Sequence, residues 1–353
     1  MTQQAFIEAS SRDRSTELLD CLKRWRLAID PSAAIAPSKN QVLVCRDERG
    51  RRVLVKVAKQ HSRRGLIREA TALETLESLF EPRQPLVGVP QVVAFERDLG
   101  VLAIAWIEQA ETLHDFHQHD RRYSPALGYA LGSALAFLHT RTRDAAGTLP
   151  DAITRYQDAD YVRMFVYVTP EVYAELSPAG LAFMRRVHGH AEAYRALYEL
   201  SCREDPSCLV HGDLKLANLL WTRTRPRRIV VIDWERACWG DPARDLGALL
   251  ADYLVGWLSP SGVVERIAEP RLTRFVQAIW QRYVNQRGDT FPLEPDFQLR
   301  VMRWAAYALL LMTYGHTEYD GRFDEADRHL TDCALHMLAC PAAWAQRLLS
   351  HDV

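Results

Sequence analysis

The stretch LVHGDLKLANLLW, residues 209–221, decides the fold expected of this chain. It places a polar His-Gly-Asp turn between two apolar segments, and Asn218 follows Asp213 by five residues. A second apolar segment, RIVVIDWE at residues 228–235, leads into Asp233. Apolar segments flanking a polar turn predict strands, which would bring Asp213, Asn218 and Asp233 together at their ends.

These three side chains have the chemistry of a metal–phosphate site. Phosphoryl transfer needs cations that spread the phosphate charge and a carboxylate that orients the attacking hydroxyl. In kinase sites an aspartate orients the hydroxyl, while an asparagine five residues later and a more distant aspartate hold Mg²⁺. The spacing therefore predicts Asp213 as the catalytic base and Asn218 and Asp233 as Mg²⁺ ligands. Lys215 would act with Asp213 by stabilising the charge of the transferred phosphate, and His211 is expected to hold the turn.

Three motifs in this order, HGDLKLANLL, VIDWE and GDPARDL, resemble the aminoglycoside phosphotransferase and choline kinase family. The resemblance extends from about residue 33 to about residue 316. It implies an α+β, bilobal, protein-kinase-like fold, with an antiparallel-sheet N-terminal lobe and a mainly helical C-terminal lobe. It also implies the roles given above for Asp213, Asn218 and Asp233, and makes Asp245 a structural acid that braces the catalytic loop.

The lobe boundary implied by this resemblance places the nucleotide-binding lobe at 1–107 and the catalytic and acceptor-binding lobe at 108–353. Alternating apolar residues predict strands at 33–36, 41–46, 51–58, 85–95 and 100–107. Helical periodicity predicts helices at 14–28, 66–79, 124–140, 181–200, 246–258, 263–286, 296–315 and 323–349. The helical segments 150–200 and 260–353 are expected to shape the acceptor site, although simple packing explains 150–200 equally well.

Lys56 is the candidate for holding the nucleotide phosphates. It alternates with Val55 and Val57 in a predicted strand and should face inward, where an ammonium needs anionic partners. ATP phosphates and a helix carboxylate would be such partners. Glu69, thirteen residues on, is the first candidate for that carboxylate, with Glu74 and Glu77 as alternatives.

The loop expected to cover the phosphates, Pro37-Ser38-Lys39-Asn40, contains no glycine. Protein kinases use a glycine-rich loop there because bare backbone can approach phosphate closely. The resemblance implies that Ser38, Lys39 and Asn40 bind the phosphates instead. It further implies that the backbone of the following hinge, at Trp106 and Ile107, hydrogen-bonds the adenine of ATP.

Two groups of aromatic and histidine side chains have alternative interpretations. His114, His117 and His119 could bind a metal, but a solvated helix start is the better interpretation, since no Cys or acid accompanies them at ligand spacing. Four aromatic residues in the C-terminal helices could stack on an acceptor, although such stripes are usually core: Trp304, Tyr307, Tyr314 and Tyr319.

Composition excludes several classes of protein. A net charge of −1 makes nucleic acid an unexpected partner. The longest apolar run, 304–314, is too short to cross a bilayer, and the first twenty residues lack the apolar core of a signal peptide. Seven cysteines without metal spacing fit reduced thiols, so a cytoplasmic location without membrane association is expected.

The sequence therefore predicts an ATP- and Mg²⁺-dependent phosphotransferase that acts on a hydroxyl of a small molecule. Two alternatives remain open at this point. The acceptor could be a serine or threonine of a peptide, because residues 150–200 are basic and aromatic. The chain could also be a binding or scaffold protein that has kept the fold and lost turnover, to which the glycine-free loop points.

Overall fold

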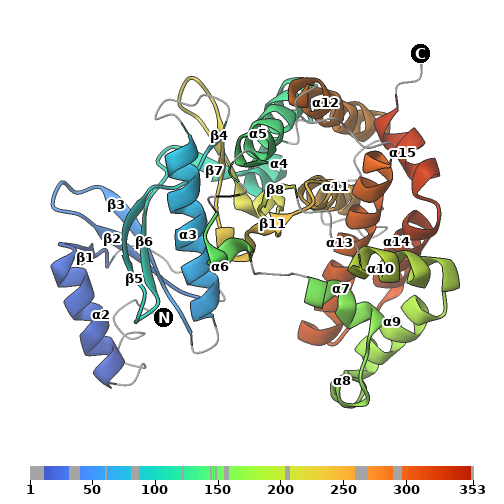
Figure 1. Ribbon diagram of the computed structural model, residues 1–353, viewed down its shortest axis with the longest axis horizontal. Helices are drawn as coiled ribbons and strands as arrows, with labels where there is room; N and C mark the ends of the chain where they lie inside the picture. The colour runs from blue at the N-terminus through green and yellow to red at the C-terminus, as the bar shows by residue number, and fades with distance from the viewer. Residues whose placement is uncertain are drawn as a thin grey trace.

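The computed structural model consists of two lobes, one built on a sheet and the other mainly helical (Figure 1). The predicted α+β, bilobal architecture is therefore confirmed. None of the described helices has both the length and the apolar character needed to cross a membrane. The structure describes residues 12–31, 40–59, 62–80, 87–120, 123–143, 145, 147, 149–154, 159–202, 207–258, 269–288 and 296–350.

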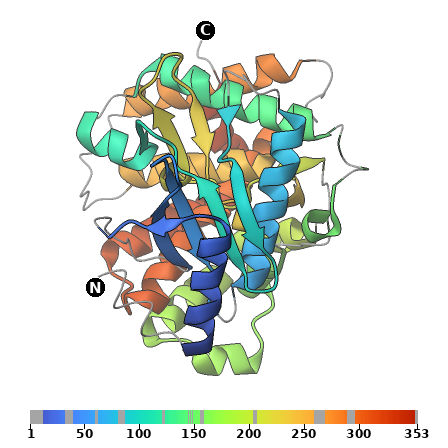
Figure 2. The same cartoon turned by 90° about the vertical axis from the view of Figure 1, so that its left-hand side faces the viewer.

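The N-terminal lobe, which faces the viewer in Figure 2, is built on five antiparallel strands in the order β1-β2-β3-β6-β5. In chain order these are β1 (Ala28–Ile29), β2 (Gln41–Arg46), β3 (Arg52–Val57), β5 (Val92–Glu96) and β6 (Val101–Ala105). Successive side chains of a strand point to opposite faces, so each face needs its own cover. Helix α2 (Arg12–Arg24) covers one face and α3 (Arg63–Leu79) the other (Figure 1).

Two small sheets flank the segments that carry Asp213, Asn218 and Asp233. One has the order β4-β10-β9-β7, in which β4 and β10 are parallel and the other pairs antiparallel. Its strands are β4 (Val87–Gly88), β7 (Ala110–Thr112), β9 (Leu219–Thr222) and β10 (Ile229–Val231). The other sheet pairs β8 (Cys208–Val210) with β11 (Cys238–Gly240). The predicted strands flanking the polar turn are thus present, as β8 before it and β9 after it.

The C-terminal lobe consists mainly of helices around one large apolar core. Two short 3₁₀ helices, η2 (Leu216–Asn218) and η3 (Trp234–Arg236), follow Lys215 and Asp233. The α-helices are α4 (Leu113–Asp120), α5 (Pro125–Arg143), α6 (Asp151–Thr154), α7 (Ala159–Val166), α8 (Pro170–Glu175), α9 (Pro178–His188), α10 (Ala191–Cys202), α11 (Ala243–Leu258), α12 (Glu269–Arg287), α13 (Phe297–Tyr319), α14 (Glu325–Ala339) and α15 (Pro341–Leu349).

Two predicted elements of the first lobe had wrong bounds. The strand expected at 85–95 is two strands, β4 and β5, that lie in different sheets, with Pro90 between them. Pro90 has no N–H to donate to a ladder, which explains the break. The helix expected at 14–28 ends at Arg24, because Arg26 takes a left-handed conformation (φ 56°) and the chain turns into β1.

Two long helices predicted in the C-terminal lobe are each two helices. The segment 181–200 divides after His188, where the Gly189 N–H closes α9 on the Arg185 carbonyl at 2.9 Å. The segment 323–349 divides at Pro341, which begins α15 because proline fits the first helical turn but cannot continue a helix. The strand predicted at 33–36 lies outside the described residues.

Candidate active site

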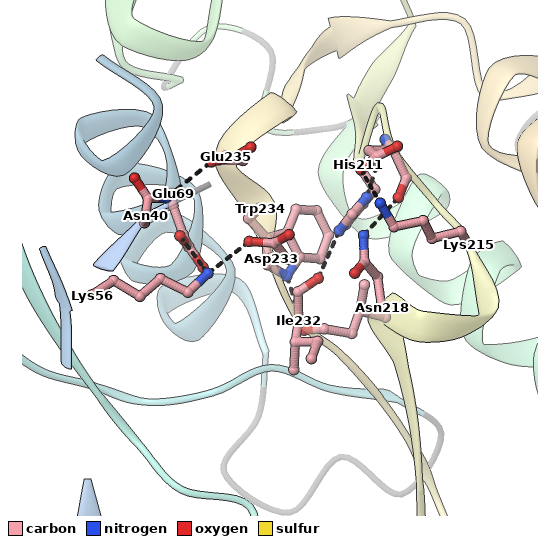
Figure 3. A network of polar contacts seen from close by, with 12 residues as sticks. Asn40, Lys56, Glu69, His211, Lys215, Asn218, Ile232, Asp233, Trp234 and Glu235 are labelled. Carbon is pink, nitrogen blue, oxygen red and sulfur yellow. Dashed lines mark hydrogen bonds and ion pairs between the residues drawn. The ribbon is translucent and has the colours of Figure 1, made fainter. Parts of the chain in front are cut away.

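Lys56 lies at the centre of a three-residue ion cluster (Figure 3). Strand β3 directs Val53, Val55 and Val57 into the core under α2 and leaves Lys56 on the α3 side. Its Nζ donates to Glu69 Oε1 at 2.7 Å and to Oε2 at 2.9 Å. The predicted Lys56–Glu69 ion pair is thus present.

The same ammonium reaches the C-terminal lobe, because Lys56 Nζ lies 2.6 Å from Asp233 Oδ1. Burial acts to lower the pKa of Lys56, but the charges of Glu69 and Asp233 outweigh it and hold that pKa above its ordinary value. Burial also acts to raise the pKa of Asp233, yet Lys56 holds it below the ordinary value. Lys56 is therefore a fixed cation beside an ionised Asp233.

The His-Gly-Asp turn, residues 211–213, is braced by Asp245 at the start of α11. One carboxylate oxygen accepts the His211 N–H at 2.8 Å, and the other accepts the Gly212 N–H at 3.0 Å. The ring of His139 donates to the same carboxylate at 3.2 Å. Burial acts to raise the pKa of Asp245, but these hydrogen bonds hold it below the ordinary value. An ionised carboxylate with no exposed surface thus fixes the backbone of the turn.

Gly212 allows the turn to adopt its shape. Its φ of +80° is disfavoured for residues with a side chain, and an added Cβ would lie 2.4 Å from the Arg236 carbonyl oxygen. The Arg244 guanidinium donates to the Gly212 carbonyl at 2.8 Å. This close approach explains why glycine occupies the position where protein kinases carry an arginine.

The ring of His211 is used for structure, as predicted. Its Nδ1 accepts the Asp213 N–H at 3.2 Å, and its Nε2 lies 2.8 Å from the Ile232 carbonyl (Figure 3). A carbonyl can only accept, so the ring carries its proton on Nε2 and has no free nitrogen to act as a base. His211 instead connects the His-Gly-Asp turn to the strand that leads into Asp233.

Asp213, Lys215 and Asn218 lie together on the loop between β8 and β9. Lys215 Nζ donates to Asp213 Oδ2 at 3.0 Å, and the Asn218 amide donates to the Asp213 carbonyl at 2.9 Å. Burial opposes the charge of Lys215, but Asp213 outweighs it and raises the pKa of Lys215. About a third of the Asp213 side chain is exposed, at 30%, so an acceptor hydroxyl can reach it.

The oxygens of Asn218 and Asp233 fit a divalent cation of the Mg²⁺ type. Because the Asn218 side chain donates through its nitrogen, its oxygen is left to accept or coordinate. Only Oδ1 of Asp233 contacts Lys56, so the second oxygen is available. The segments are tied together, since the Ile232 N–H donates to the Asn218 carbonyl at 3.0 Å. This donor set, one amide and one carboxylate oxygen, suits a hard cation.

Asn40 is the predicted phosphate-loop residue that the structure describes, whereas Ser38 and Lys39 lie outside the described residues. Asn40 Nδ2 donates to Glu235 Oε2 at 3.2 Å, while Asn40 Oδ1 is buried and has no hydrogen-bond partner among the described residues. Arg68 of α3 donates to the Glu235 carbonyl at 2.6 Å. Glu235 therefore joins the two lobes (Figure 3). Sequence reasoning missed this role.

The hinge provides fewer free backbone groups than predicted. The Ala105 N–H donates to the Gln91 carbonyl at 2.8 Å, and the Trp106 N–H donates to the Arg52 carbonyl at 3.2 Å. Both amides belong to the β-ladder and cannot also bind adenine. The amide of Ile107 makes no hydrogen bond to another described residue, so it is the N–H left for a base at this position.

Asp252 is a second acidic residue at this end of the site, and sequence reasoning missed it. It lies on α11, and its Oδ2 accepts the Leu216 N–H of the catalytic loop at 2.7 Å. Burial raises its pKa, opposed by this hydrogen bond and by the charges of His114 and Lys215. Its spacing in the sequence could have identified it, because Asp252 follows Asp245 by two helical turns and therefore shares the same face of α11.

The candidate histidine and aromatic side chains are either packed in the protein interior or exposed at its surface. His114 and His119 are exposed, but His117 is buried, contrary to the predicted solvated helix start, and its ring stacks on Tyr123. In the described ranges, no three or more His, Cys, Asp and Glu side chains come together in a group that could hold a metal ion. Of the four aromatics, Tyr307 is buried core, Trp304 and Tyr314 are partly buried against the core, and Tyr319 is 91% exposed.

Comparison with known proteins identifies the family of this chain. The model of the phosphotransferase enzyme family matches residues 35–286. Viomycin phosphotransferase of Streptomyces vinaceus is 38% identical over 95 residues, which cover 24% of this chain and 32% of the relative. The matched segment therefore spans about a third of the length of this curated relative.

Solved structures share the fold over almost the whole chain. Amicoumacin kinase in complex with AMP-PNP, Ca²⁺ and amicoumacin has a TM-score of 0.59 at 15% identity, covering 94% of this chain and 95% of its own. A choline kinase from Streptococcus pneumoniae has a TM-score of 0.54 at 15% identity, covering 93% and 99%. At these identities the likeness shows the fold, which is the protein-kinase-like fold predicted. Because the family model matches more than half of its residues, the chain belongs to the phosphotransferase enzyme family.

Proposed function

We propose that this phosphotransferase moves the γ-phosphate of ATP to a hydroxyl group of a small molecule, with Mg²⁺ as the metal. The observation that carries the proposal is the contact of Lys56 with Glu69 and Asp233. Lys56 and Asp233 are 177 positions apart in the sequence. The contact places a fixed cation from the sheet lobe beside the carboxylate proposed to hold the metal. A phosphate chain bound there would lie between the Lys56 ammonium and the metal proposed at Asp233, and so between two positive charges.

The side chains of this protein divide the work of transfer. Lys56 binds the α- and β-phosphates, which replace part of its contact with Asp233. Asp213 orients the acceptor hydroxyl and accepts its proton, and Lys215 stabilises the charge of the transferred group. Asn218 and Asp233 would hold Mg²⁺, which supplies charge neutralisation to the phosphates when bound. The Ile107 N–H is the hinge group proposed to bind the adenine.

The acceptor is proposed to be a small molecule that carries a cationic group near its hydroxyl. Asp252 binds the loop that carries Asp213 and Lys215, so two carboxylates lie at the acceptor end. Opposite charge at that end attracts an ammonium and disfavours an anion. The names of the relatives agree with a small acceptor, since viomycin, amicoumacin and choline are small molecules.

A test is release of ADP from Mg·ATP in the presence of four classes of acceptor. These classes are amino alcohols, neutral sugars, cationic antibiotics and peptides that contain serine or threonine. Asp213→Asn serves as the inactive control, and Asp252→Asn keeps an oxygen for the Leu216 N–H while removing charge. We expect amine-bearing small molecules to stimulate release, and Asp252→Asn to raise their KM about tenfold.

The alternatives give different results in the same assay. Stimulation by peptides alone would replace the small-molecule acceptor with a protein substrate. Mg·ATP binding without release for any acceptor, and without slow hydrolysis that depends on Asp233, would favour the scaffold interpretation. Stimulation by neutral sugars that Asp252→Asn leaves unchanged would contradict the cationic acceptor while leaving the phosphotransferase reaction intact.

A further inference from the structure

A cavity of about 590 Å³ lies between α5, α12 and the connection from β9 to β10, away from the residues proposed to be catalytic. None of the residues discussed above as catalytic, metal-binding or nucleotide-binding lines it. Helices α5 and α12 lie side by side there (Figure 1). The lining residues are Ala126, Tyr129, Ala130, Ser133, Arg227, Arg228, Gln281, Arg282 and Asn285.

The close packing of α5 and α12 builds one wall of this cavity. Positions 126, 129, 130 and 133 recur at helical spacing, so they share one face of α5. Next to this face, Gly132 allows α12 to approach so closely that an added Cβ would lie 2.4 Å from the Ile279 carbonyl oxygen. The approach brings Ser133 under Arg282, whose Nε donates to the Ser133 hydroxyl at 2.8 Å. Ser133 is buried and thus fixes the orientation of that guanidinium.

The other two arginines are positioned by the strand connection. The Arg228 N–H donates to the buried Thr222 hydroxyl at 2.9 Å, which fixes its backbone. The Arg228 side chain lies across Gly88 of β4, since a Cβ there would be 3.5 Å from the Arg228 Cζ. The Arg227 guanidinium lies 5.9 Å from the centre of the Trp221 ring. These contacts hold the two side chains at the rim without neutralising their charge.

The cavity concentrates positive charge in a chain whose net charge is −1. No carboxylate lines it. None of Arg227, Arg228 and Arg282 forms an ion pair with an acidic residue in the part of the chain that the structure describes. Three guanidinium groups that share one cavity repel each other, and an anion bound between them would remove that repulsion.

We propose that this cavity binds a small oligophosphate, meaning a molecule with two or more linked phosphate groups. Guanidinium groups match phosphate oxygens in paired hydrogen bonds, which favours phosphate over a simple halide. The volume lies in the range of small-molecule sites. The half-exposed ring of Tyr129 and the amide of Asn285 supply the polar and aromatic contacts that such a molecule can also use.

The test is calorimetric titration of the full-length protein with inorganic tripolyphosphate and, separately, with ADP, in EDTA at fixed ionic strength. Lys56→Met should weaken binding at the proposed active site and leave the cavity between α5 and α12 intact, so it separates binding at the two places. The diagnostic variant is Arg228→Gln/Arg282→Gln. Arg225→Gln is the matched control, because Arg225 belongs to the same connection but does not line the cavity.

We expect tripolyphosphate binding to persist in Lys56→Met and to weaken at least about tenfold in Arg228→Gln/Arg282→Gln. Arg225→Gln should change it less than about threefold. Binding of ADP at the Lys56-independent site would identify nucleotides as a source of the oligophosphate, and binding of tripolyphosphate alone would exclude them. Equal weakening by Arg225→Gln would show diffuse surface attraction and overturn the proposal, as would loss of all binding in Lys56→Met.

Discussion

The Lys56 side chain shows how this protein tolerates a charge that is only 8% exposed. An isolated buried ammonium costs several kcal/mol, and two carboxylates at hydrogen-bond distance offset that cost. When Glu69 is ionised, the cluster of one ammonium and two carboxylates carries a net negative charge. A metal bound at Asp233 would offset this negative charge, so the ion cluster suits a site that binds a cation.

The pH dependence of stability tests the environment of Glu69. Burial raises the pKa of Glu69 to about 7, with Lys56 opposing and Asp233 adding to the rise. The folded protein therefore keeps a proton that the unfolded chain has already lost, and the free energy of unfolding falls as pH rises toward this pKa. The Glu69→Gln variant has no carboxyl group at this position, so its stability does not depend on the protonation of residue 69.

We expect the free energy of unfolding of the ligand-free wild-type protein, relative to that of Glu69→Gln, to decrease from about pH 5 to about pH 8. Urea unfolding at a series of pH values measures the difference. A difference that does not change between these pH values would show that burial does not raise the pKa of Glu69, and would contradict the prediction.

The loop between β8 and β9 is held by a neighbouring helix as well as by its own hydrogen bonds. Asp245 and Asp252 of α11 accept three of its backbone N–H groups, those of His211, Gly212 and Leu216. The helix α11 is itself fixed by α13, since a Cβ at Gly247 would lie 2.6 Å from the Trp304 Cβ. The position of the loop thus depends on the core of the helical lobe.

Asp245→Ala should lower both stability and turnover. It leaves two buried N–H groups and His139 without an acceptor, so we expect a loss of about 3 kcal/mol or more in the free energy of unfolding. Turnover should fall because the position of Asp213 is no longer fixed. Asp332→Ala is the control, since Asp332 pairs with Arg186 in solvent and should change stability by less than about 1 kcal/mol. Equal effects of the two substitutions would contradict the bracing role.

On the scale of the whole molecule, the site is where the two lobes meet. Lys56 contacts Asp233, and Asn40 contacts Glu235 across 195 residues of sequence. Arg68 of α3 adds a third contact to the same segment, which carries η3. Relative movement of the lobes would break these contacts together, so the proposed binding of phosphates at Lys56 would depend on lobe position.

The parts of this arrangement that are encoded locally were predictable from the sequence. The spacing of Asp213 and Asn218 and the alternation around Lys56 depend on a few neighbouring residues, and both were found in the expected elements. The Lys56–Glu69 ion pair could be predicted because it needs only one strand and the helix that follows it. The breaks at Gly189 and Pro341 were missed because apolar periodicity continues across them.

Contacts between distant segments were not predictable in the same way. The Asn40–Glu235 hydrogen bond and the cavity lined by Arg228 and Arg282 depend on how separate elements are packed. The hinge shows a further limit, since only the sheet register reveals that the Trp106 N–H already has a partner. Local pattern identifies the residues of the site, whereas tertiary packing determines which of their atoms remain free.

The most direct test of the phosphotransferase site is to measure Mg·ATP binding and phosphoryl transfer on the same preparations of the wild-type protein and Asp213→Asn. Asp213 is placed to act on the acceptor hydroxyl, while Lys56, Asn218 and Asp233 are assigned to the nucleotide and its metal. The account predicts that the Kd for Mg·ATP changes less than about threefold, while transfer falls at least about a hundredfold. Unchanged transfer in Asp213→Asn, or absence of Mg·ATP binding in the wild-type protein, would contradict it.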